Sequence, residues 1–407
     1  MSINVVMAYS GGLDTSVAIP WLKEKYDADV ITLTIDLGGG KSDSDVKDRA
    51  IKSGAVKAIV VDAREDFVNH FVFPALQAGA IYQGVYPLAT ALARPLIARY
   101  LVEVARMEKA QAVAHGCTGK GNDQVRFDLG VTSLEPSLKI IAPAREWNMT
   151  RDQEVEYARA KNIPLEFGSK NTYSIDENLW GRSIEAGDLE DPWNEPAEEA
   201  FSWTNAAQDT PDSPTYVTIS FESGIPRAID DKTLDGIELI EKLNGLAGRN
   251  GIGRIDHLED RLVGIKSREV YEAPAGTVLH MAHRALESAV LTKDQIKFKD
   301  KVSVEYSEIV YNGLWYTGFH EDLKAYVSNT QKYVSGKIRL KLFKGHCTVV
   351  GRTSPYSLYN HNLATYDTGD QFDHTASEGF IHIYGLGGRT QGRMQPQILP
   401  TLKGNLE

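Results

Sequence analysis

A turn rich in glycine and hydroxyl groups near the N-terminus constrains the fold of this chain more than any other feature. An apolar run at residues 3–8 leads into Ser10-Gly11-Gly12-Leu13-Asp14-Thr15-Ser16, and residues 17–26 have the pattern of a helix. A strand, a tight glycine turn and a helix N-terminus form a cradle for phosphate, because the backbone N–H groups and the helix dipole point at the anion. The hydroxyls of Ser10, Thr15 and Ser16 add donors. We therefore expect a phosphate-bearing ligand at this turn.

The turn differs from two commoner phosphate-binding motifs. A Walker A loop requires a hydroxyl residue after its Gly-Lys pair, and Gly121 follows Gly119-Lys120 instead. The dinucleotide fingerprint G-x-G-x-x-G fails at Gly251-Ile252-Gly253, because Asp256 stands where the third glycine belongs.

Length, charge and cysteine content restrict the class of protein. A chain of 407 residues suggests two or three domains, and a net charge of −11 argues against a nucleic-acid partner. Two cysteines, Cys117 and Cys347, do not make a disulfide scaffold and suit a reducing compartment. The N-terminus has no targeting pattern, and no apolar stretch is long enough for a membrane span. We expect a cytoplasmic protein.

The first part of the chain has a βα rhythm. Strands are predicted at 3–8, 30–36, 58–62, 112–115 and 139–142, and helices at 17–26, 45–53, 95–109 and 151–161, the last with a capping box of Thr150 and Gln153. Such alternation predicts an α/β fold with a doubly wound parallel sheet. Ligands of such sheets lie beyond the carboxyl ends of the strands. The glycine-rich turns at 10–12, 38–40 and 116–121 should therefore converge at one edge.

The second part predicts an α+β domain. Residues 168–214 hold many prolines, tryptophans and acids, and predict a long connection. A strand at 216–221, helices at 233–244, 277–291 and 294–311, and a hairpin at 337–350 follow. The tail has too little periodicity for a domain and is expected to pack on a neighbouring subunit. The predicted domains are 1–167, which carries the phosphate-binding turn, 168–360, and a C-terminal tail at 361–407 for oligomerisation.

A second cluster of chemistry-bearing residues, at 115–127, follows a predicted strand. Three glycines, two amides, a carboxylate and two cations in so short a run are costly for a structural turn. Thr118, Asn122 and Asp123 can hold the ammonium and carboxylate of an amino acid, and Arg126 can grip a carboxylate with both arms of its guanidinium. His115 taken alone is more often structural than catalytic.

Several blocks of the chain resemble a known family. The string at 10–16 resembles the loop of N-type ATP-pyrophosphatases, which cleave ATP between its α and β phosphates. Together with the run at 115–127 it resembles the argininosuccinate synthase family, and further blocks agree in order and spacing, at 86–95, 173–180, 185–187, 253–256, 264–268 and 271–276. The resemblance runs from residue 3 to residue 290 and more weakly to residue 360.

The resemblance implies ATP-dependent condensation of citrulline and aspartate to argininosuccinate, with AMP and pyrophosphate released through a citrullyl-adenylate. It implies a homotetramer and Mg²⁺ that accompanies ATP without a protein metal cage. The ATP-binding residues would be Ala8, Tyr9, Ser10, Gly11, Gly12, Leu13, Asp14, Thr15, Ser16, Ile35 and Gly116. The residues that bind citrulline and aspartate would be Tyr86, Thr90, Ala91, Thr118, Asn122, Asp123, Arg126, Ser174, Ser183, Glu259 and Tyr271. Ser10, Asp14, Thr15, Ser16 and Asp123 would carry the chemistry.

Some positions depart from the family pattern. Ala91 stands where other members carry serine, Asp260 where asparagine is usual, and Cys117 where alanine is common, while Gly38-Gly39-Gly40 replaces Gly-Gln. Cys117 is expected to be a small packing residue, because the implied reaction has no covalent enzyme step. Asp14 has two open roles, since it could orient a water on a metal or cap the helix that follows.

Two other functions compete with this interpretation. A tRNA-thiolating enzyme of the same loop superfamily would need a reactive cysteine pair and a basic RNA surface, which two distant cysteines and an acidic net charge disfavour. A non-enzymatic nucleotide sensor would not need the amino-acid-binding residues at 118–126 and 174–183.

Overall fold

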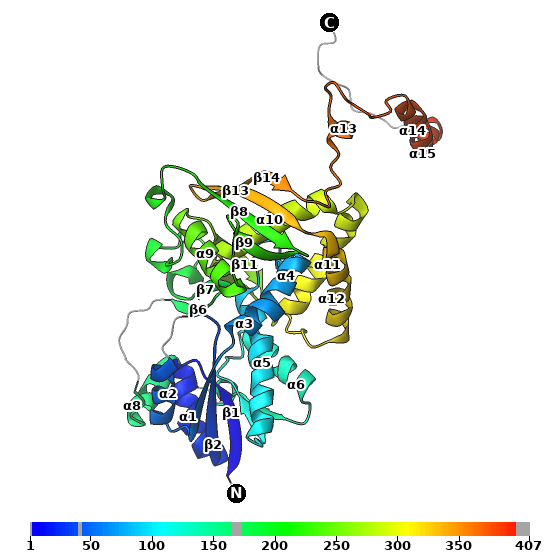
Figure 1. The fold of residues 1–407 in the computed structure, drawn as a ribbon. Helices are drawn as coiled ribbons and strands as arrows, with labels where there is room; N and C mark the ends of the chain where they lie inside the picture. Colours follow the sequence, from blue (N-terminus) through cyan, green and yellow to red (C-terminus); the bar gives the residue numbers. More distant parts are fainter. Residues whose placement is uncertain (1, 40–42, 148, 165–172, 396–407) are drawn as a thin grey trace. The chain divides into compact units, whose positions relative to one another are not determined.

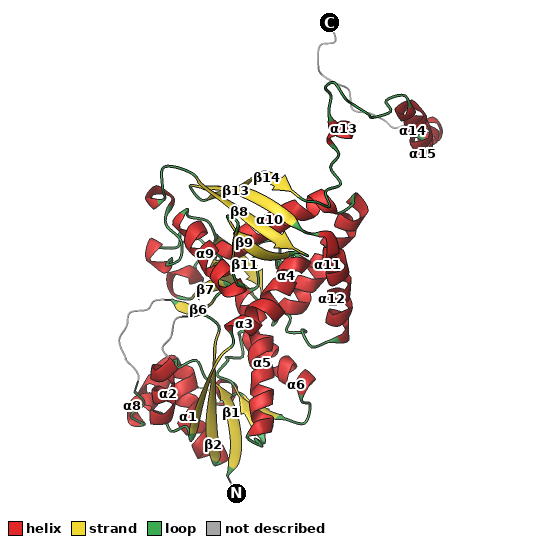
Figure 2. Cartoon of the chain, in the orientation of Figure 1, coloured by secondary structure: helices red, strands yellow, loops and turns green. Residues whose placement is uncertain are grey.

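A parallel sheet with helices on both faces forms the N-terminal part of the molecule (Figure 1 and Figure 2). The computed structural model describes residues 2–39, 43–147, 149–164 and 173–395, in two compact units, Met1–Tyr356 and Ser357–Glu407. The strands are β1 (Ile3–Ala8), β2 (Ala28–Asp36), β3 (Lys57–Asp62), β4 (Ala112–Ala114) and β5 (Lys139–Ile141). They pair in parallel in the order β3-β2-β1-β4-β5. The predicted parallel sheet is confirmed.

Alternate residues of the central strand face opposite helical layers. The helices are α1 (Leu13–Tyr26), α2 (Asp43–Lys52), α5 (Ala89–Met107), α6 (Asn122–Leu134), α7 (Pro143–Glu146) and α8 (Arg151–Ala160). Val5 and Met7 pack with apolar side chains of α1 and α2, whereas Val6 packs with those of α5 and α6. Because strand side chains alternate between faces, this division shows that both faces are buried, as the doubly wound arrangement requires.

Two antiparallel sheets and four long helices form the rest of the first unit. One sheet has the order β10-β9-β8-β13-β14 and the other β11-β12-β7-β6. Their strands are β6 (Ser174–Asn178), β7 (Gly181–Glu185), β8 (Thr215–Glu222), β9 (Ile225–Ile229), β10 (Lys232–Thr233), β11 (Arg254–Asp260), β12 (Lys266–Glu272), β13 (Gly336–Phe343) and β14 (His346–Thr353). The helices are α9 (Gly236–Arg249), α10 (Pro274–Val290), α11 (Lys293–Tyr311) and α12 (Gly318–Thr330).

A helical arm from the N-terminal part joins this second core. It consists of α3 (Arg64–Phe67), a π-helical turn (Val68–Val72) and α4 (Phe73–Ala78). Phe67 and Phe71 of the arm belong to the same hydrophobic cluster as Leu239 and Leu279 of the second part. One continuous core therefore fixes the second part against the N-terminal part, and the pocket between the sheets has rigid walls.

Several boundaries differ from the sequence-based predictions. The stretch predicted as a connection contains β6 and β7, whose polar sequences hide their strand character because one side faces a pocket. Helix α5 begins at Ala89, ahead of the start predicted at Pro95, and α9 continues through Gly245 to Arg249. The capping box is confirmed, with Thr150 N–H donating to Gln153 Oε1 at 2.8 Å and Gln153 N–H donating to Thr150 Oγ1 at 3.4 Å.

The second unit carries three short helices in its described part, which ends at residue 395. They are α13 (His361–Ala364), α14 (Ala376–Tyr384) and α15 (Leu386–Met394). Neither α14 nor α15 buries a side chain, and the exposed ones include Phe380, Ile381 and Tyr384. Across the described residues of both units, each helix is too short or too polar to cross a membrane.

A buried carboxylate at the end of β12 binds a loop to the sheet that contains β12. Glu272 is fully buried and accepts hydrogen bonds from Arg182 Nη1 at 2.8 Å and from Thr204 Oγ1 at 2.7 Å. The backbone N–H groups of Ser202, Trp203 and Thr204 donate to the same carboxylate at 2.9–3.0 Å. The loop at 202–204 is thus bound to the sheet through one side chain, which makes Glu272 a point of high structural sensitivity.

We predict that Glu272→Gln lowers the free energy of unfolding by about 3–5 kcal/mol, because Arg182 loses its buried counter-charge. Urea denaturation of both proteins measures the difference. Glu222→Gln is the matched control, since the Glu222 side chain is 75% exposed and lies 3.7 Å from Arg227. The control is expected to shift stability by no more than about 0.5 kcal/mol. Equal effects of the two changes would contradict the assigned role of Glu272.

Candidate active site

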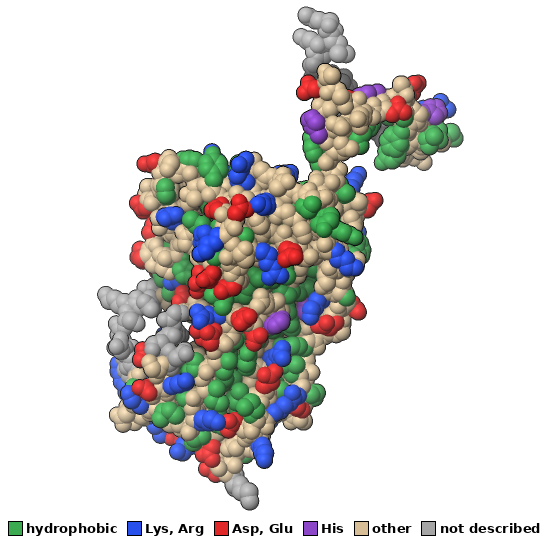
Figure 3. Space-filling view, in the orientation of Figure 1, with side chains coloured by type: hydrophobic (Ala, Val, Ile, Leu, Met, Phe, Trp, Pro, Cys, Tyr) green, Lys and Arg blue, Asp and Glu red, His purple; other side chains and the backbone are tan. Residues whose placement is uncertain are grey.

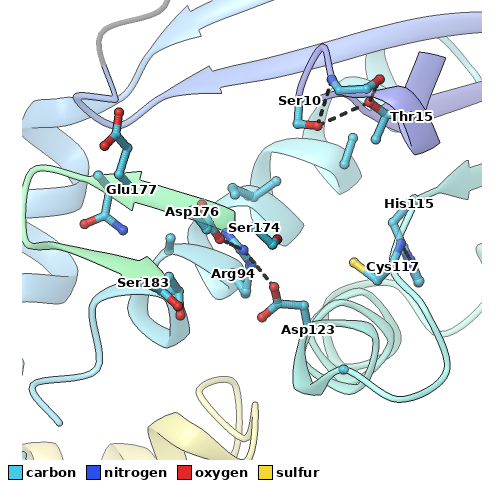
Figure 4. Close-up of a pocket in the computed structure, with 18 of the residues that line it drawn as sticks. Ser10, Thr15, Arg94, His115, Cys117, Asp123, Ser174, Asp176, Glu177 and Ser183 are labelled. Atoms are coloured by element: carbon cyan, nitrogen blue, oxygen red, sulfur yellow. Dashed lines mark hydrogen bonds and ion pairs between the residues drawn. The ribbon is translucent and has the colours of Figure 1, made fainter. Parts of the chain in front are cut away.

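One pocket of about 750 Å³ lies at the carboxyl ends of the parallel strands and continues between the two parts of the first unit. The predicted glycine turns converge there, since Gly12, Gly39, Gly116 and Gly121 all line it. Gly40 lies outside the described residues. The site is therefore assembled by β1, β2 and the turn after β4 on one side and by β6, β7, β11 and β12 on the other. Figure 4 shows part of this pocket, with Ser10 and Thr15 at one end and Ser183 at the other.

Most residues predicted from the sequence line this pocket. Those that do are Ala8, Tyr9, Ser10, Gly12, Leu13, Asp14, Thr15, Ile35, Tyr86, Thr90, Gly116, Thr118, Asn122, Asp123, Arg126, Ser174, Ser183, Glu259 and Tyr271. Gly11, Ser16 and Ala91 do not line it. Ser16 is buried beneath the loop, where its hydroxyl lies 3.0 Å from Tyr9 Oη, and Ala91 is fully buried in α5. These two side chains support the site from behind.

The phosphate loop is held in shape by its own hydroxyls and by α2. Ser10 Oγ lies 3.2 Å from Thr15 Oγ1 and accepts a weak hydrogen bond from Gly12 N–H at 3.4 Å. Gly11 has a φ of 74°, which favours glycine, and its carbonyl accepts from Arg49 Nη1 at 2.7 Å. The loop passes close to the second turn, since a Cβ on Gly116 would lie 2.8 Å from Thr15 Cγ2. The N–H groups of the loop and of α1 are thus pre-arranged for an anion.

Asp14 lines the pocket in the first turn of α1 and forms a pair with Glu154 of α8. The cap position of α1 is Gly12, which has no side chain to accept a hydrogen bond, and Asp14 lies in the first turn of the helix. Burial of Glu154, together with the nearby charge of Asp14, raises the pKa of Glu154 to about 8. The pair therefore holds one proton at neutral pH, and a cation near it would favour loss of that proton.

His115 fixes the second glycine turn. Its Nδ1 accepts from Cys117 N–H at 3.2 Å, so its Nε2 carries the proton that faces Asp128 Oδ1 at 2.8 Å. Arg145 Nη1 donates to the other oxygen of Asp128 at 2.7 Å. His115 is therefore a scaffold for the turn that carries Gly116.

Two arginines hold Asp123 at the start of α6. Arg94 Nη2 lies 2.7 Å from Asp123 Oδ2, and Arg126 Nη1 lies 3.0 Å from Asp123 Oδ1. Burial opposes ionisation of Asp123, but the two guanidinium groups outweigh it and lower its pKa to about 2. Arg94 also donates to Asp176 of β6, on the opposite wall (Figure 4). Asp123 is thus an ionised carboxylate at neutral pH.

Arg126 keeps one arm of its guanidinium free of protein partners. Its Nε donates to the carbonyl of Tyr311 at 2.9 Å, and the guanidinium carbon lies 4.7 Å from the centre of the Tyr311 ring. Within the described residues, its Nη2 is buried and has no hydrogen-bond partner. Because a buried N–H without an acceptor is costly, this group fits the carboxylate of a ligand in the pocket.

Glu259 is a buried carboxylate that collects three donors. Tyr271 Oη donates to it at 2.6 Å, Tyr311 Oη at 2.7 Å, and Asn122 Nδ2 at 3.4 Å. Burial and the charge of Glu259 raise the pKa of Tyr311 well above its usual value, so this tyrosine remains a donor. Tyr86 stacks on Tyr271 with 4.1 Å between ring centres. The result is a rigid polar wall suited to an α-amino acid.

The remaining part of this wall combines three charged residues. Arg261 Nη2 lies 2.6 Å from Glu185 Oε2 and 2.6 Å from Glu269 Oε1. Burial of Glu269 and the nearby charge of Glu185 raise the pKa of Glu269 to about 8. Two carboxyl groups thus share one guanidinium. At neutral pH the proton on Glu269 leaves one negative charge to pair with the positive charge of Arg261.

Sequence reasoning missed several of these residues. Arg94 and Asp176 stand inside blocks that carry the family resemblance, so their position beside Pro95 and Ser174 was an available signal. Tyr311 gave no signal, because it lies at the end of a helix remote in sequence from every motif. Glu154 belongs to helix α8, whose sequence is rich in charged residues, so from sequence alone its acidic side chains are expected to face solvent.

Comparisons with known proteins cover the whole chain. A family model described as "Arginosuccinate synthase N-terminal HUP domain" matches residues 4–164, and one described as "Arginosuccinate synthase C-terminal domain" matches residues 173–391. The chain is 56% identical over 405 residues to the argininosuccinate synthase of Dehalococcoides mccartyi strain 195, with 100% of each chain covered. It is 54% identical to that of Symbiobacterium thermophilum, over 94% of this chain and 95% of the other.

Similarity to solved structures is much weaker. A U34-tRNA thiolase from Methanococcus maripaludis matches 42% of this chain and 61% of its own, with 17% identity and a TM-score of 0.27. A likeness at this level does not bear on function.

Both thiols are expected to be poorly reactive. Burial raises the pKa of Cys347 to about 12 and that of Cys117 further, so little thiolate is present at pH 8. We predict that iodoacetamide labels each cysteine at least about tenfold more slowly in the native protein than in urea-unfolded protein. Mass spectrometry of the two tryptic peptides measures the rates. Rapid native labelling of Cys117 would contradict its assignment as a packing residue.

Proposed function

The chain belongs to the argininosuccinate synthase family, whose members are ligases that form a C–N bond, and from this premise we propose how the pocket performs that reaction. The substrates are ATP, citrulline and aspartate, and the products are argininosuccinate, AMP and pyrophosphate. The observation that carries the proposal is a single pocket that joins the glycine loop at residues 10–16 to two clusters of charged and polar side chains, around Asp123 and Glu259. A nucleotide sensor would not need either cluster.

The phosphate loop would hold ATP for the first half-reaction. The N–H groups of residues 10–16 and the N-terminus of α1 would bind the phosphates, and Ile35 and Gly116, which line the pocket, would contact the nucleoside. The ureido oxygen of citrulline attacks the α-phosphorus, the bond to the β-phosphate oxygen breaks, and pyrophosphate leaves. Such phosphoryl transfer depends on positioning and on neutralised charge rather than on a protein nucleophile.

Citrulline would lie against the wall made by Tyr86, Glu259 and Tyr271. The Nη2 of Arg126, which has no hydrogen-bond partner among the described residues, supports binding of the α-carboxylate there, and the side-chain oxygens of Glu259 support binding of the α-ammonium. Ser174 and Ser183 line the same pocket from β6 and β7 and would orient the ureido end.

Aspartate would act in the second half-reaction from a place beside Asp123. Its amine attacks the ureido carbon of the citrullyl-adenylate, the carbon–oxygen bond to AMP breaks, and a proton is released. A carboxylate with a pKa of about 2 is a weak base, so Asp123 would orient the ammonium before it is deprotonated. Thr118 and Asn122 line the pocket next to Asp123 and would hold the aspartate carboxylates.

Mg²⁺ would accompany the phosphates of ATP. It prefers oxygen ligands and keeps several waters, so one or two carboxylates near the loop suffice. The carboxyl groups of Asp14 and Glu154 fit this need, since Asp14 lines the pocket and is paired with Glu154. The metal would neutralise charge on the phosphates, and Asp14 would hold one of its waters. Of the described residues, no group of three or more His, Cys, Asp or Glu forms a metal cage.

We also propose the organisation and setting of the protein. The proposed domains are 1–167, 168–360 and 361–407; the family models match residues 4–164 and 173–391, and the compact second unit begins at Ser357. Exposed apolar side chains on α14 and α15 support a role of the tail in a homotetramer. Two free thiols, Cys117 and Cys347, support a cytoplasmic location.

The tRNA-thiolating alternative gains no support from the site. Cys117 follows β4 of the parallel sheet, whereas Cys347 lies in β14 of an antiparallel sheet. Burial raises the pKa of both thiols, whereas thiolation needs a reactive cysteine pair. On the face drawn in Figure 3, basic and acidic side chains are interspersed. Pyrophosphate release in the presence of citrulline and ATP, followed by argininosuccinate formation with aspartate, tests the proposed function directly. No citrulline-dependent release would refute it.

We predict that Asp123→Ala lowers argininosuccinate formation by about ten- to a hundredfold, the value of one charge-assisted hydrogen bond. Citrulline-dependent exchange of pyrophosphate into ATP is expected to persist in part, because aspartate enters only afterwards. The two half-reactions are measured separately with labelled pyrophosphate and by product chromatography. A thermal melt shows whether the variant is folded. Equal loss of both half-reactions would show that Asp123 does not act on aspartate.

We predict that Arg126→Lys raises the KM for citrulline by about tenfold or more, although the charge is kept. An ammonium cannot contact Tyr311, Asp123 and a ligand carboxylate at once, as the guanidinium does. Steady-state kinetics with varied citrulline measure the effect. Arg106→Lys is the matched control, because Arg106 pairs with Glu135 on the surface. An unchanged KM for citrulline in Arg126→Lys would show that Arg126 does not bind citrulline and has a structural role.

A further inference from the structure

We propose that Arg94 is a positioning residue of the second half-reaction, which fixes Asp123 in the orientation that receives the aspartate ammonium. Arg94 belongs to none of the sets of residues inferred above for ATP, citrulline or aspartate. The proposal rests on the proposed function, because it assigns a partner to Asp123 in that reaction.

Arg94 occupies the junction of three elements around the pocket. Its side chain leaves α5, is only 13% exposed, and lies between Asp123 of α6 and Asp176 of β6 (Figure 4). Its Nη2 donates to one oxygen of each carboxylate. Within the described residues its Nε is buried without a partner. The position of the guanidinium therefore depends on these two carboxylates and on the ring of Phe127, 6.0 Å away.

The two arginines leave one side of Asp123 open. Arg94 occupies Oδ2 and Arg126 occupies Oδ1, while each carboxylate oxygen has a second lone pair. The Asp123 side chain is 30% exposed, so these lone pairs can be reached from the pocket. An incoming ammonium then finds a carboxylate whose plane is already set, which avoids the entropy of orienting a free side chain. Without Arg94, only Arg126 would hold Asp123, through a single oxygen.

Arg94 also helps keep Asp123 ionised. The charged or titratable groups around Asp123 are Arg94 from α5, Arg126 from its own helix, the Cys117 thiol from the preceding turn, and Asp176 across the pocket. Of these only the two arginines favour the ionised form. Burial and the charge of Asp176 both favour the protonated form of Asp123. When Arg94 is removed, only Arg126 opposes them, so the pKa of Asp123 rises. Ammonium binding is then lost as the pH falls through the new pKa, in a range where the parent protein is unaffected.

Arg94→Gln tests the proposal in the full-length protein. The KM for aspartate is expected to rise by about ten- to a hundredfold, since one charge-assisted hydrogen bond to Asp123 is lost. Citrulline-dependent exchange of pyrophosphate into ATP is expected to keep its KM for citrulline. The acid limb of kcat/KM for aspartate is expected to move to higher pH in the variant. A thermal melt and citrulline binding by calorimetry establish that the variant is folded.

Two further variants separate positioning from general damage. Arg94→Lys keeps a point charge beside Asp123 and is expected to restore the parent acid limb, while it recovers the aspartate KM only in part. Arg99→Gln is the matched control on the same helix, because Arg99 pairs with Glu103 in solvent. It is expected to change neither the aspartate KM nor the pH profile.

The outcomes are distinct for the two proposals. If the parent protein forms no argininosuccinate, the proposed function fails and Arg94 has no reaction to serve. If the parent is active but Arg94→Gln keeps its aspartate KM and acid limb, the role of Arg94 alone is overturned. A parallel rise in the citrulline and aspartate KM values would also overturn it, because general distortion of the pocket would explain such a result.

Discussion

The buried carboxylate of Glu259 is the interaction on which the rest of the pocket depends. It draws together Asn122 from α6, Tyr271 from β12 and Tyr311 from α11, three elements that no local sequence signal connects. Tyr311 in turn holds Arg126 through its carbonyl and stacks on Tyr82, with 3.6 Å between ring centres. Desolvating one carboxylate is costly, and three donors with good geometry offset that cost. These hydrogen bonds therefore fix the shape of this end of the pocket within the protein itself.

Electrostatics divide the pocket into regions with different protonation. Asp123 has a pKa near 2 because two arginines face it, whereas burial and like charge raise the pKa values of Glu154 and Glu269 to about 8. Asp123 is thus ionised at neutral pH and can accept hydrogen bonds from a cation. The carboxyl next to the phosphate loop instead holds a proton that a cation can displace. Three acids of similar intrinsic strength acquire separate roles from their surroundings.

The sequence predicted the parallel sheet well and the antiparallel part poorly, for a physical reason. Strands β1, β2 and β4 are buried on both faces, so they appear as short apolar runs followed by glycine turns. Strands β6 and β11 line the pocket with polar side chains, and their sequences lack the apolar alternation by which strands are recognised. Within the site, residues in glycine turns could be found from sequence, whereas Tyr311 and Glu154 lie on helices whose polar positions look solvated.

Three positions that depart from the family pattern, Ala91, Asp260 and Cys117, differ in whether they line the pocket. Ala91 is fully buried behind Thr90 and does not line the pocket, so a missing hydroxyl there is separated from the substrates by the helix itself. Asp260 is bound to Lys266 at 2.5 Å and to Gln83 at 2.7 Å on the surface, where its charge has a partner and is screened by solvent. Cys117 does line the pocket, but its raised pKa keeps it a neutral thiol beside Arg94. A neutral, small side chain at that position leaves the pairing of Arg94 with Asp123 intact, which an anionic thiolate would compete with. The side chain at position 117 must therefore be uncharged as well as small.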